Sequence, residues 1–332
     1  MIAPPKRILF VRMDRIGDLV LTLPSDQNPL FRESEKLWFI STGLEFVAEN
    51  AIPPRRFVGW KKEFSWSQFL LFIKKVREFA PQISVSFQSP WWVTFALWLS
   101  GVPERVGVLS SWHSFLFLNY GLRQKRSRCE HHELDYNHLL VQKTLTPRFA
   151  AQTAYLKMVG PAFKSPLPQS YIVIHPGMAG SALNWPIAHY RNLILAMSQK
   201  IPVIITGTAT DRSILEPLEE TLPKRENILW FNERLNPQQL LGVLQNAKAV
   251  FAPSTGVLHL AAALGVPTRG IYSPVNVQKA ERWGPRGPNT NTWTPSVPCP
   301  GRFRCLGSAC KHFNCMELVS PQEIEDNISK LI

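Results

Sequence analysis

Short runs of β-branched and aromatic residues recur along the chain and alternate with helical patterns. The runs span residues 8–11, 36–41, 83–87, 171–177, 202–207, 249–254 and 268–274. Helical patterns lie between several of them, at residues 67–79, 188–199 and 236–246. This alternation is typical of βαβ units, whose strands form parallel sheets with helices on their faces. The sequence therefore predicts an α/β fold.

The runs fall into two groups. A helical pattern over residues 131–145 and a Pro-containing stretch up to about residue 170 separate them. A chain of 332 residues is long for one core, because a domain usually takes about 100 to 200 residues. We predict two similar α/β domains, over residues 1–150 and 171–332, joined by a linker over residues 151–170.

The first run ends in a cluster of charges. In "RILFVRMDRIGDLVLTLP", which begins at residue 7, a strand over Ile8–Val11 is followed by Arg12, Asp14, Arg15 and Asp18, and a helix begins near Asp18. A secretory signal needs an uninterrupted apolar core of about 7 to 15 residues, so we reject one and expect a cytoplasmic protein. Ligands of open α/β sheets bind at the carboxyl ends of the strands. We therefore expect this charged loop to face a crevice.

The longest apolar passage is "WWVTFALWLSGV", over residues 91–102. It is shorter than the roughly 18 to 20 residues of a membrane-spanning helix. We expect a buried helix under the sheet, and the alternative is that its tryptophans favour a membrane interface. The second reading implies peripheral contact with a membrane surface.

The overall charge favours an anionic partner. The chain has 37 Lys and Arg against 24 Asp and Glu, a net charge of +13, and such a surplus attracts anions. Nucleic acid, a phosphorylated glycolipid and an acidic membrane face all fit, so the charge alone does not choose among them. Because the sequence shows no recognised nucleic-acid-binding module, we expect no nucleic-acid partner.

A strand-to-helix junction in the second half has the features of a phosphate site. In "AVFAPSTGVLHLAAALGVPTRGIYSP", which begins at residue 249, a strand ends at Ala252 and a helix covers Val257–Leu264. Free backbone N–H groups and the helix dipole favour an anion at such a helix N-terminus. The candidate ligands are Ser254, Thr255, Gly256 and His259. The alternative is that Ser254 and Thr255 only cap the helix.

A second junction lies in "VIHPGMAGSALNWP", which begins at residue 173. The loop after the strand contains Gly177, Gly180 and Ser181, and Pro186 is placed to begin a helix at its first position. Glycines allow a ligand to approach the backbone closely, although they also suit a loop that is merely flexible. Both interpretations stay open.

Three motifs together resemble glycosyltransferase family 9, the ADP-heptose:lipopolysaccharide heptosyltransferases. "FVRMDRIGDLVLTLP" is similar to the family's N-terminal signature, in which a Gly-Asp pair follows the first strand. "HPG" followed by "NWP" is similar to the opening of its donor domain, and "STGVLHLAAALGVP" resembles its diphosphate loop. Their order and spacing agree over most of the chain.

The resemblance implies a GT-B fold, that is, two Rossmann-like domains facing a central cleft. The first domain binds the acceptor and the second binds the nucleotide-sugar, here ADP-heptose. The implied reaction inverts the anomeric centre, needs no metal or other cofactor, and transfers a heptose or related sugar to the lipopolysaccharide inner core or a similar surface glycan. The alternatives are a sugar-nucleotide-binding protein that lacks catalysis or has another specificity, and a basic nucleic-acid-binding protein.

Asp18 corresponds in this resemblance to the catalytic base, which takes the proton of the acceptor hydroxyl. A carboxylate near a helix N-terminus is stabilised in its ionised form, so we expect Asp18 to be charged and only weakly basic. Asp14 is the rival base, and a simple capping role for Asp18 is the structural alternative. Two basic clusters suit an anionic acceptor. The candidates among them are Lys61, Lys62, Arg55 and Arg126.

The sequence departs from the family at two donor positions. Leu183 occupies the place of a usual Lys, and Ser254 occupies that of a frequent Asp, which leaves the nucleotide open. The resemblance assigns no role to the C-terminal cysteines, Cys299, Cys305, Cys310 and Cys315. Four thiolates bind zinc, but this spacing lacks the paired C-x2-C of strong zinc motifs. Burial and redox pairing are the other interpretations.

Overall fold

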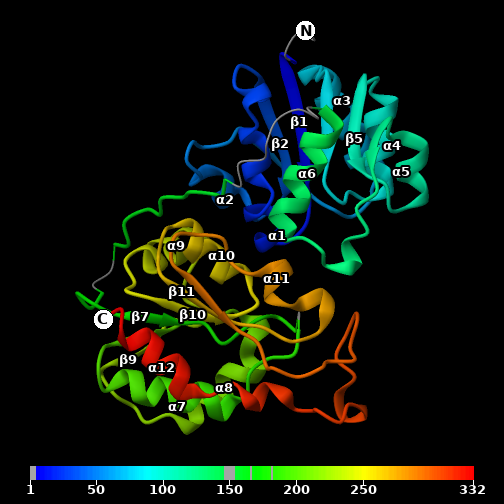
Figure 1. Ribbon diagram of the computed structural model, residues 1–332. Coiled ribbons are helices and arrows are strands. Elements are labelled where there is room, and N and C mark those ends of the chain that lie inside the picture. Colours follow the sequence, from blue (N-terminus) through cyan, green and yellow to red (C-terminus); the bar gives the residue numbers. More distant parts are fainter. Residues whose placement is uncertain (1–4, 146–153, 165–166, 181) are drawn as a thin grey trace. The chain divides into compact units, whose positions relative to one another are not determined.

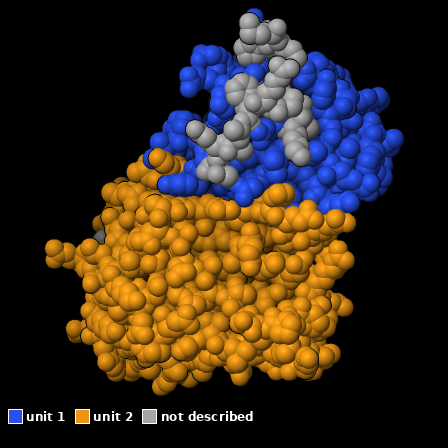
Figure 2. All heavy atoms as spheres, in the orientation of Figure 1, with its two compact units in different colours: residues 1–126, 133–156 blue, residues 127–132, 157–332 orange. Residues whose placement is uncertain are grey.

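The computed structural model of the chain describes residues 5–145, 154–164, 167–180 and 182–332. The chain divides into two compact units (Figures 1 and 2). Unit 1 comprises residues 1–126 and 133–156, and unit 2 comprises residues 127–132 and 157–332. The predicted linker lies partly outside the described residues.

Unit 1 contains a six-stranded, entirely parallel sheet in the order β3-β2-β1-β4-β5-β6. Its central strands are almost completely buried, which explains why they read as continuous apolar runs. The strands are β1 (Arg7–Arg12), β2 (Glu35–Ser41), β3 (Phe57–Trp60), β4 (Ile83–Ser86), β5 (Glu104–Val108) and β6 (Tyr120–Leu122).

Helices cover this sheet and form its hydrophobic core. Leu9 and Phe39 of the sheet pack with Phe72 and Trp92 of the helices, and all four are buried. The helices of unit 1 are α1 (Ile16–Val20), α2 (Glu45–Glu49), α3 (Trp66–Phe79), α4 (Trp91–Leu99), α5 (Trp112–Phe117) and α6 (Glu133–Leu145).

Unit 2 repeats the same topology. Its parallel sheet has the order β12-β11-β10-β7-β8-β9, so its first and fourth strands, β7 and β10, are neighbours, as are β1 and β4 in unit 1. The strands are β7 (Ile172–Ile174), β8 (Val203–Ile205), β9 (Ile228–Trp230), β10 (Val250–Pro253), β11 (Thr268–Ile271) and β12 (Thr290–Trp293).

The core of unit 2 lies between its sheet and helices that come from both the beginning and the end of the unit's sequence. Ile172 and Leu193 pack together with Leu218 and Ile324. The helices are α7 (Ile187–Ser198), α8 (Arg212–Thr221), α9 (Pro237–Gln245), α10 (Gly256–Ala263), α11 (Ala280–Trp283) and α12 (Pro321–Ser329). Two Rossmann-like sheets confirm the predicted α/β class.

The strand order fixes where ligands are expected. In each sheet the chain winds outwards in one direction from the first strand and in the other from the fourth, so the order reverses between them. Open α/β sheets bind ligands outside the carboxyl ends of the strands at this reversal point. The relevant loops are therefore those after β1 and β4 in unit 1, and after β7 and β10 in unit 2.

The structure corrects several local expectations. Helix α1 begins at Ile16, before Asp18, and Pro186 is the N-cap of α7 and not its first helical residue. Five strands were not predicted, β3, β5, β6, β9 and β12, because each has partly exposed positions and lacks a long apolar run. The apolar passage forms α4, which buries Trp92 but exposes Trp91 and Trp98. No helix within the described ranges is long and apolar enough to cross a membrane.

Candidate active site

Asp18 lies at the carboxyl end of β1, as the sequence predicts. The strand ends at the buried Arg12, and the short helix α1 follows. Asp18 is the third residue of α1, and its Oδ2 accepts a hydrogen bond from the backbone N–H of Arg15 at 3.3 Å. The Thr22 hydroxyl donates to the Asp18 carbonyl oxygen at 2.6 Å. Asp18 therefore helps to cap its helix, while its other carboxylate oxygen is engaged elsewhere.

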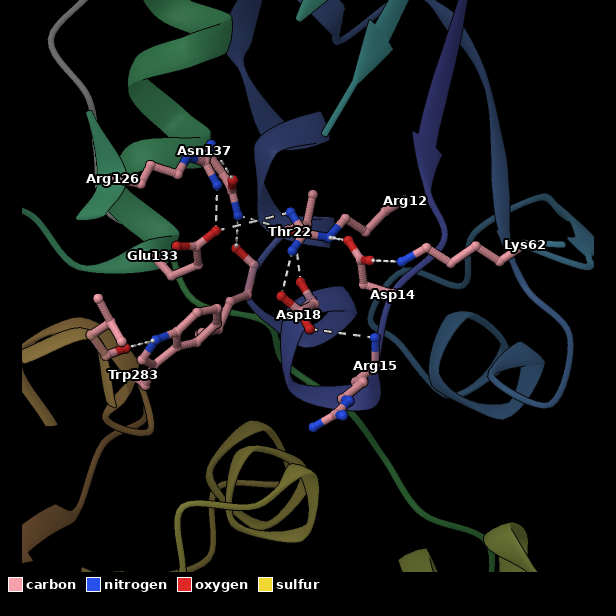
Figure 3. Close-up of polar contacts among 12 residues, drawn as sticks. Arg12, Asp14, Arg15, Asp18, Thr22, Lys62, Arg126, Glu133, Asn137 and Trp283 are labelled. Carbon is pink, nitrogen blue, oxygen red and sulfur yellow. Dashed lines mark hydrogen bonds and ion pairs between the residues drawn. The ribbon is translucent and has the colours of Figure 1, made fainter. Parts of the chain in front are cut away.

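The partner of that second oxygen is Arg12. The Arg12 guanidinium forms ion pairs with Asp18 Oδ1 and, at 3.0 Å, with Asp14 Oδ2. Oε1 of Glu133, the first residue of α6, lies 4.0 Å from Arg12 Nη1. Figure 3 shows the three carboxylates arranged around this one buried cation. Lys62 Nζ reaches the other oxygen of Asp14 at 2.6 Å.

Buried side chains on and near α6 extend this network. Arg126 forms an ion pair with Glu133 and donates to Asn137 Oδ1 at 3.1 Å. Asn137 Nδ2 in turn donates to the Thr22 hydroxyl at 3.0 Å. Since Thr22 bonds to the Asp18 backbone, α6 and the loop after β1 hold each other in place (Figure 3). Sequence reasoning missed Arg12, Glu133 and Asn137 as members of the site.

The surroundings of Asp18 shift its pKa in the direction opposite to the effect of its helix position. Burial raises the pKa of Asp18 above its ordinary value of 3.8, the Arg12 guanidinium opposes that rise, and the carboxylates of Asp14 and Glu133 add to it. The direction of this shift is opposite to the one expected from the helix position, because desolvation of the carboxylate outweighs the stabilisation from the Arg12 cation and from the Arg15 N–H. Burial lowers the pKa of Arg12, but the three carboxylates more than compensate, so it stays a cation.

The predicted acceptor residues divide into two kinds. Lys61 and Lys62 are exposed after β3, and the carbonyl oxygen of Lys62 accepts a hydrogen bond from Trp92 Nε1 at 3.1 Å. Arg55 is buried, and two of its nitrogens donate to Asp26 at 2.9 Å.

Arg126 is likewise buried on Glu133. The structure therefore assigns Arg55 and Arg126 to internal ion pairs and not to an exposed acceptor surface. Their sequence neighbours were basic, which suggested one solvent-facing patch, but a guanidinium with a buried carboxylate partner is commonly structural.

The candidate donor loop in unit 2 follows β10. Thr255 is the N-cap of α10, but its side chain makes no capping hydrogen bond to the described residues. Ser254 makes a side-chain hydrogen bond with the buried Tyr272. The backbone N–H groups of the first turn of α10, from Gly256 onward, point toward the N-terminus of the helix, as in any α-helix. Ser254, Thr255 and Gly256 carry no formal charge, so the loop offers backbone donors and a helix dipole.

Burial determines the charge of His259. It lies in α10 and is 4% exposed, and its Nδ1 has no hydrogen-bond partner among the described residues. Burial, assisted by His132, lowers its pKa to about 3. The imidazole is therefore uncharged at neutral pH. It can donate one N–H to an anion but cannot supply a positive charge.

In the loop after β7, close packing requires Gly177 and a left-handed backbone conformation favours Gly180. A Cβ at Gly177 would stand 2.1 Å from Cγ of Asp211, and Gly180 has a φ of +69°. Asp211 accepts hydrogen bonds from Ala179 N at 3.1 Å and from Thr208 N at 3.0 Å. Burial raises the pKa of Asp211, but these hydrogen bonds hold it below its ordinary value. Asp211 thus organises the loop, and Ser181 lies outside the described residues.

The "NWP" motif also has a structural role. Asn184 Nδ2 donates to the Pro176 carbonyl at 2.9 Å and its Oδ1 accepts from Tyr190 Oη at 2.9 Å. Trp185 is buried and donates to the Val319 carbonyl at 3.0 Å. Leu183 is partly buried against the core of unit 2. An apolar residue at this position therefore has a packing role.

The C-terminal cysteines form no disulfide. All four line one small apolar cavity together with Leu183: Cys299, Cys305, Cys310 and Cys315. Burial raises the pKa of Cys315, and the neighbouring cysteines add to the rise. Across the described ranges, no three His, Cys, Asp or Glu side chains are grouped so that they can hold a metal ion. The described residues therefore do not offer the set of ligands that the zinc interpretation requires.

Comparison with solved structures establishes the fold. The chain is similar to ADP-heptose LPS heptosyltransferase II of E. coli, with a TM-score of 0.80 over 98% of each chain and 14% identity. It is also similar to E. coli heptosyltransferase WaaC solved with ADP, with a TM-score of 0.68, 18% identity, and coverage of 98% of this chain and 100% of that one. At these identities the likeness establishes the fold, which is GT-B.

Sequence comparison then places the chain in a family. The model of glycosyltransferase family 9 (heptosyltransferase) matches residues 102–303, more than half of the chain. A provisionally named glycosyltransferase of Haemophilus influenzae is 25% identical over 299 residues, covering 84% of this chain and 86% of that protein. The chain belongs to glycosyltransferase family 9. It is a transferase related to the heptosyltransferases of lipopolysaccharide biosynthesis.

Proposed function

We propose that the protein transfers a heptose from ADP-heptose to a hydroxyl group of the lipopolysaccharide inner core, with inversion and without a metal. The proposal rests on the position of Asp18, which forms an ion pair with Arg12 at the reversal point of the unit 1 sheet. Its surroundings raise the pKa of Asp18. The donor and the product ADP belong in this proposal to unit 2. The WaaC structure contains ADP, which supports the choice of nucleotide.

The chemistry proceeds in one displacement. The Asp18 carboxylate takes the proton of the acceptor hydroxyl while that oxygen attacks the anomeric carbon. The bond between the anomeric carbon and the diphosphate oxygen breaks, and ADP leaves with the electron pair. A general base contributes about 10² to 10⁴ in rate, and a raised pKa brings Asp18 closer to the operating pH.

The departing diphosphate is stabilised by unit 2. We assign this to the backbone amides of Thr255 and Gly256 at the N-terminus of α10, together with the N–H of the uncharged His259. The absence of an acidic residue at Ser254 removes a repulsion. The missing cation at Leu183 removes an attraction, so we expect ADP to bind more weakly than a site with a lysine would allow.

A non-catalytic sugar-nucleotide-binding protein is the second candidate, and the uncharged donor loop is the observation that favours it. Purified protein is mixed with ADP-heptose and heptose-deficient lipopolysaccharide, and both ADP release and ADP binding are measured. Turnover that disappears in Asp18→Asn while ADP still binds supports the transferase. Binding without any turnover supports the second candidate. Mass spectrometry of lipopolysaccharide from cells lacking the protein then identifies the acceptor step.

An exposed aromatic surface supports peripheral membrane contact. Trp66 is 70% exposed and Trp112 is 64% exposed. The exposed apolar side chains lie before and on α3, α4 and α5, which form one end of unit 1 in Figure 1: Phe64, Trp66, Leu70, Leu71, Trp91, Trp98, Trp112, Phe115 and Leu116. We call this set the aromatic face. Ring contacts run across it, such as Phe64–Trp91 at 5.3 Å between centroids.

Basic side chains accompany the aromatic face. Lys61, Lys74, Lys75 and Arg77 are exposed on or beside α3. Tryptophans next to lysines suit the headgroup region of an anionic bilayer, because the rings enter the interface while the cations attract the lipid phosphates. We therefore propose an anionic lipid surface as the partner of this face.

Vesicle co-sedimentation tests the membrane contact. We expect binding to phosphatidylglycerol-containing vesicles but not to pure phosphatidylcholine, and loss of binding in Trp66→Ser/Trp112→Ser. The matched control is Phe303→Ser/Leu318→Ser, which removes equally exposed apolar side chains from unit 2. Vesicle binding by the tryptophan variant at the wild-type level would contradict the assignment. It would also be contradicted if the wild-type protein formed a dimer that this variant cannot form, because the aromatic face would then be a dimer interface.

A further inference from the structure

Unit 1 contains a cavity beside the catalytic loop that the mechanism does not use. Its volume is about 220 Å³. It lies at the carboxyl ends of β4 and β5, where α4 and α5 begin. The residues that line it are Ser86, Gln88, Ser89, Thr94, Val108, Ser110, Ser111, His113, Ser114 and Leu118.

The lining is rich in hydroxyl groups and has no formal charge at neutral pH. Six of the ten lining residues are Ser or Thr, and no Asp, Glu, Lys or Arg is among them. Thr94 Oγ1 lies 2.9 Å from His113 Nδ1, within hydrogen-bond distance. Burial lowers the pKa of His113 below its ordinary 6.5, so the imidazole is neutral.

Two hydroxyl groups of the lining have no partner. Ser86 is 3% exposed, and the Oγ atoms of Ser86 and Ser89 are buried without a hydrogen bond to the described residues. Buried polar groups are normally hydrogen-bonded, and each exception needs an explanation. A ligand that bonds to both hydroxyls provides one.

The backbone beside these serines is also unusual. Gln88 has a φ of +50°, in the left-handed region that non-glycine residues rarely adopt, and such residues gather at functional sites. Gln88 is exposed at the end of β4, so no burial of its side chain accounts for this conformation.

Strand pairing places the cavity next to the catalytic residues. β4 is the direct neighbour of β1, and Ser86 pairs in register with Val11, the residue before Arg12. The loops after the two strands therefore emerge at one edge of one sheet, at its reversal point. A ring bound in the cavity lies beside the loop that presents Asp18.

We propose that this cavity binds an uncharged, hydroxyl-rich sugar ring of the acceptor. The identification of this sugar as part of the acceptor rests on the proposed function, whereas the binding of a sugar ring does not. An anionic sugar carrying a carboxylate or phosphate finds no cation in the lining, and the nearby Arg12 and Lys62 are already paired with carboxylates. The anionic groups of the acceptor then lie outside the cavity. The serine, threonine and glutamine side chains supply donors and acceptors for ring hydroxyls.

Ligand-observed saturation-transfer NMR tests the binding without any turnover. The probes are the methyl glycosides of mannose, glucose, galactose and N-acetylglucosamine, with glucuronate and mannose 6-phosphate as anionic counterparts. We expect a signal from at least one uncharged glycoside, and a signal at least five-fold weaker from the anionic probes. No signal from any uncharged glycoside, or equal signals from the anionic ones, overturns the proposal.

Variants locate the signal in the cavity. Ser86→Ala/Ser89→Ala removes the two unpartnered hydroxyls, and we expect the signal to fall at least five-fold. The matched control is Ser84→Ala, which removes another buried, unpartnered hydroxyl of β4 that does not line the cavity. Ser110→Phe fills the cavity from an exposed position, so it abolishes the signal without disturbing the core. An unchanged signal in both cavity variants contradicts the proposal.

Kinetics separate this inference from the proposed function. In an active transferase, Ser86→Ala/Ser89→Ala raises the KM for the acceptor several-fold and leaves the KM for the donor unchanged. If the protein has no transferase activity but the glycoside signal depends on these serines, the proposed function fails and the sugar site stands. If transfer is observed with an unchanged acceptor KM, the sugar site fails and the function stands.

Discussion

The loops after β1 and β10 occupy reversal points of two sheets with the same strand order, yet they differ in electrostatics. The loop after β1 belongs to a network of three cations and three carboxylates: Arg12, Lys62, Arg126, Asp14, Asp18 and Glu133. The loop after β10 has only uncharged candidates, Ser254, Thr255, Gly256 and His259. A shared topology therefore fixes where a ligand binds, whereas the loop residues determine the chemistry.

In the proposed mechanism, the difference follows from the task of each loop: the loop after β1 moves a proton, and the loop after β10 holds a diphosphate. Moving a proton requires a titratable group, and a buried carboxylate is tolerated only beside a compensating cation. Holding a diphosphate requires donors that remain in place throughout the reaction. Backbone amides at a helix N-terminus provide them without a second buried charge.

The largest expected effect concerns the stability of unit 1. Arg12→Met leaves Asp14, Asp18 and Glu133 without their shared cation, and breaking a buried pair costs about 3 to 5 kcal/mol. Urea denaturation measures the loss. The control is Arg56→Met, whose partner Glu35 is also exposed, and such surface pairs are worth about 0 to 1 kcal/mol. Equal losses in the two variants would show that Arg12 has no special role.

A second prediction concerns pH. In the proposed mechanism Asp18 acts as a base only when it is ionised, so we expect activity to fall as the pH drops through its raised pKa. The acid limb of kcat/KM is therefore expected above the ordinary aspartate value of 3.8. Glu133→Gln removes a carboxylate that raises this pKa, so the limb should move to lower pH. Glu35→Gln, at the surface, should leave it in place. A shift in the opposite direction would refute the electrostatic account.

The smallest expected effect is on the donor side. Leu183→Lys restores a cation near the proposed diphosphate site, and a charge-assisted hydrogen bond contributes up to about 1.5 to 3 kcal/mol, so we expect calorimetry to show tighter ADP binding. Because Leu183 packs partly on the core, the melting temperature should fall. Leu195→Lys, at another partly buried position on that core, should lose stability without gaining affinity. Unchanged ADP binding in Leu183→Lys would place the diphosphate elsewhere.

The sequence predicted those features that depend on residues close together along the chain. The run Ile8–Val11 and the charges after it were sufficient to place Asp18 at the end of the first strand. The environment of Asp18 depends on distant residues: Asn137 meets Thr22 across 115 positions, and no local pattern reports such a pair. Likewise, nothing near Gly177 indicates Asp211. The burial of His259 was not predicted, although its place between Leu258 and Leu260 in an apolar helix is a local signal for burial.

The central claim is that Asp18, and not Asp14, is the base. Steady-state transfer by Asp18→Asn and Asp14→Asn, with ADP binding measured on the same samples, tests it most directly. Asparagine keeps the size of the side chain and removes its basicity. The account predicts at least a roughly 10²-fold lower turnover for Asp18→Asn, a smaller loss for Asp14→Asn, and unchanged ADP binding in both. Near wild-type turnover by Asp18→Asn, or the larger loss in Asp14→Asn, would contradict it.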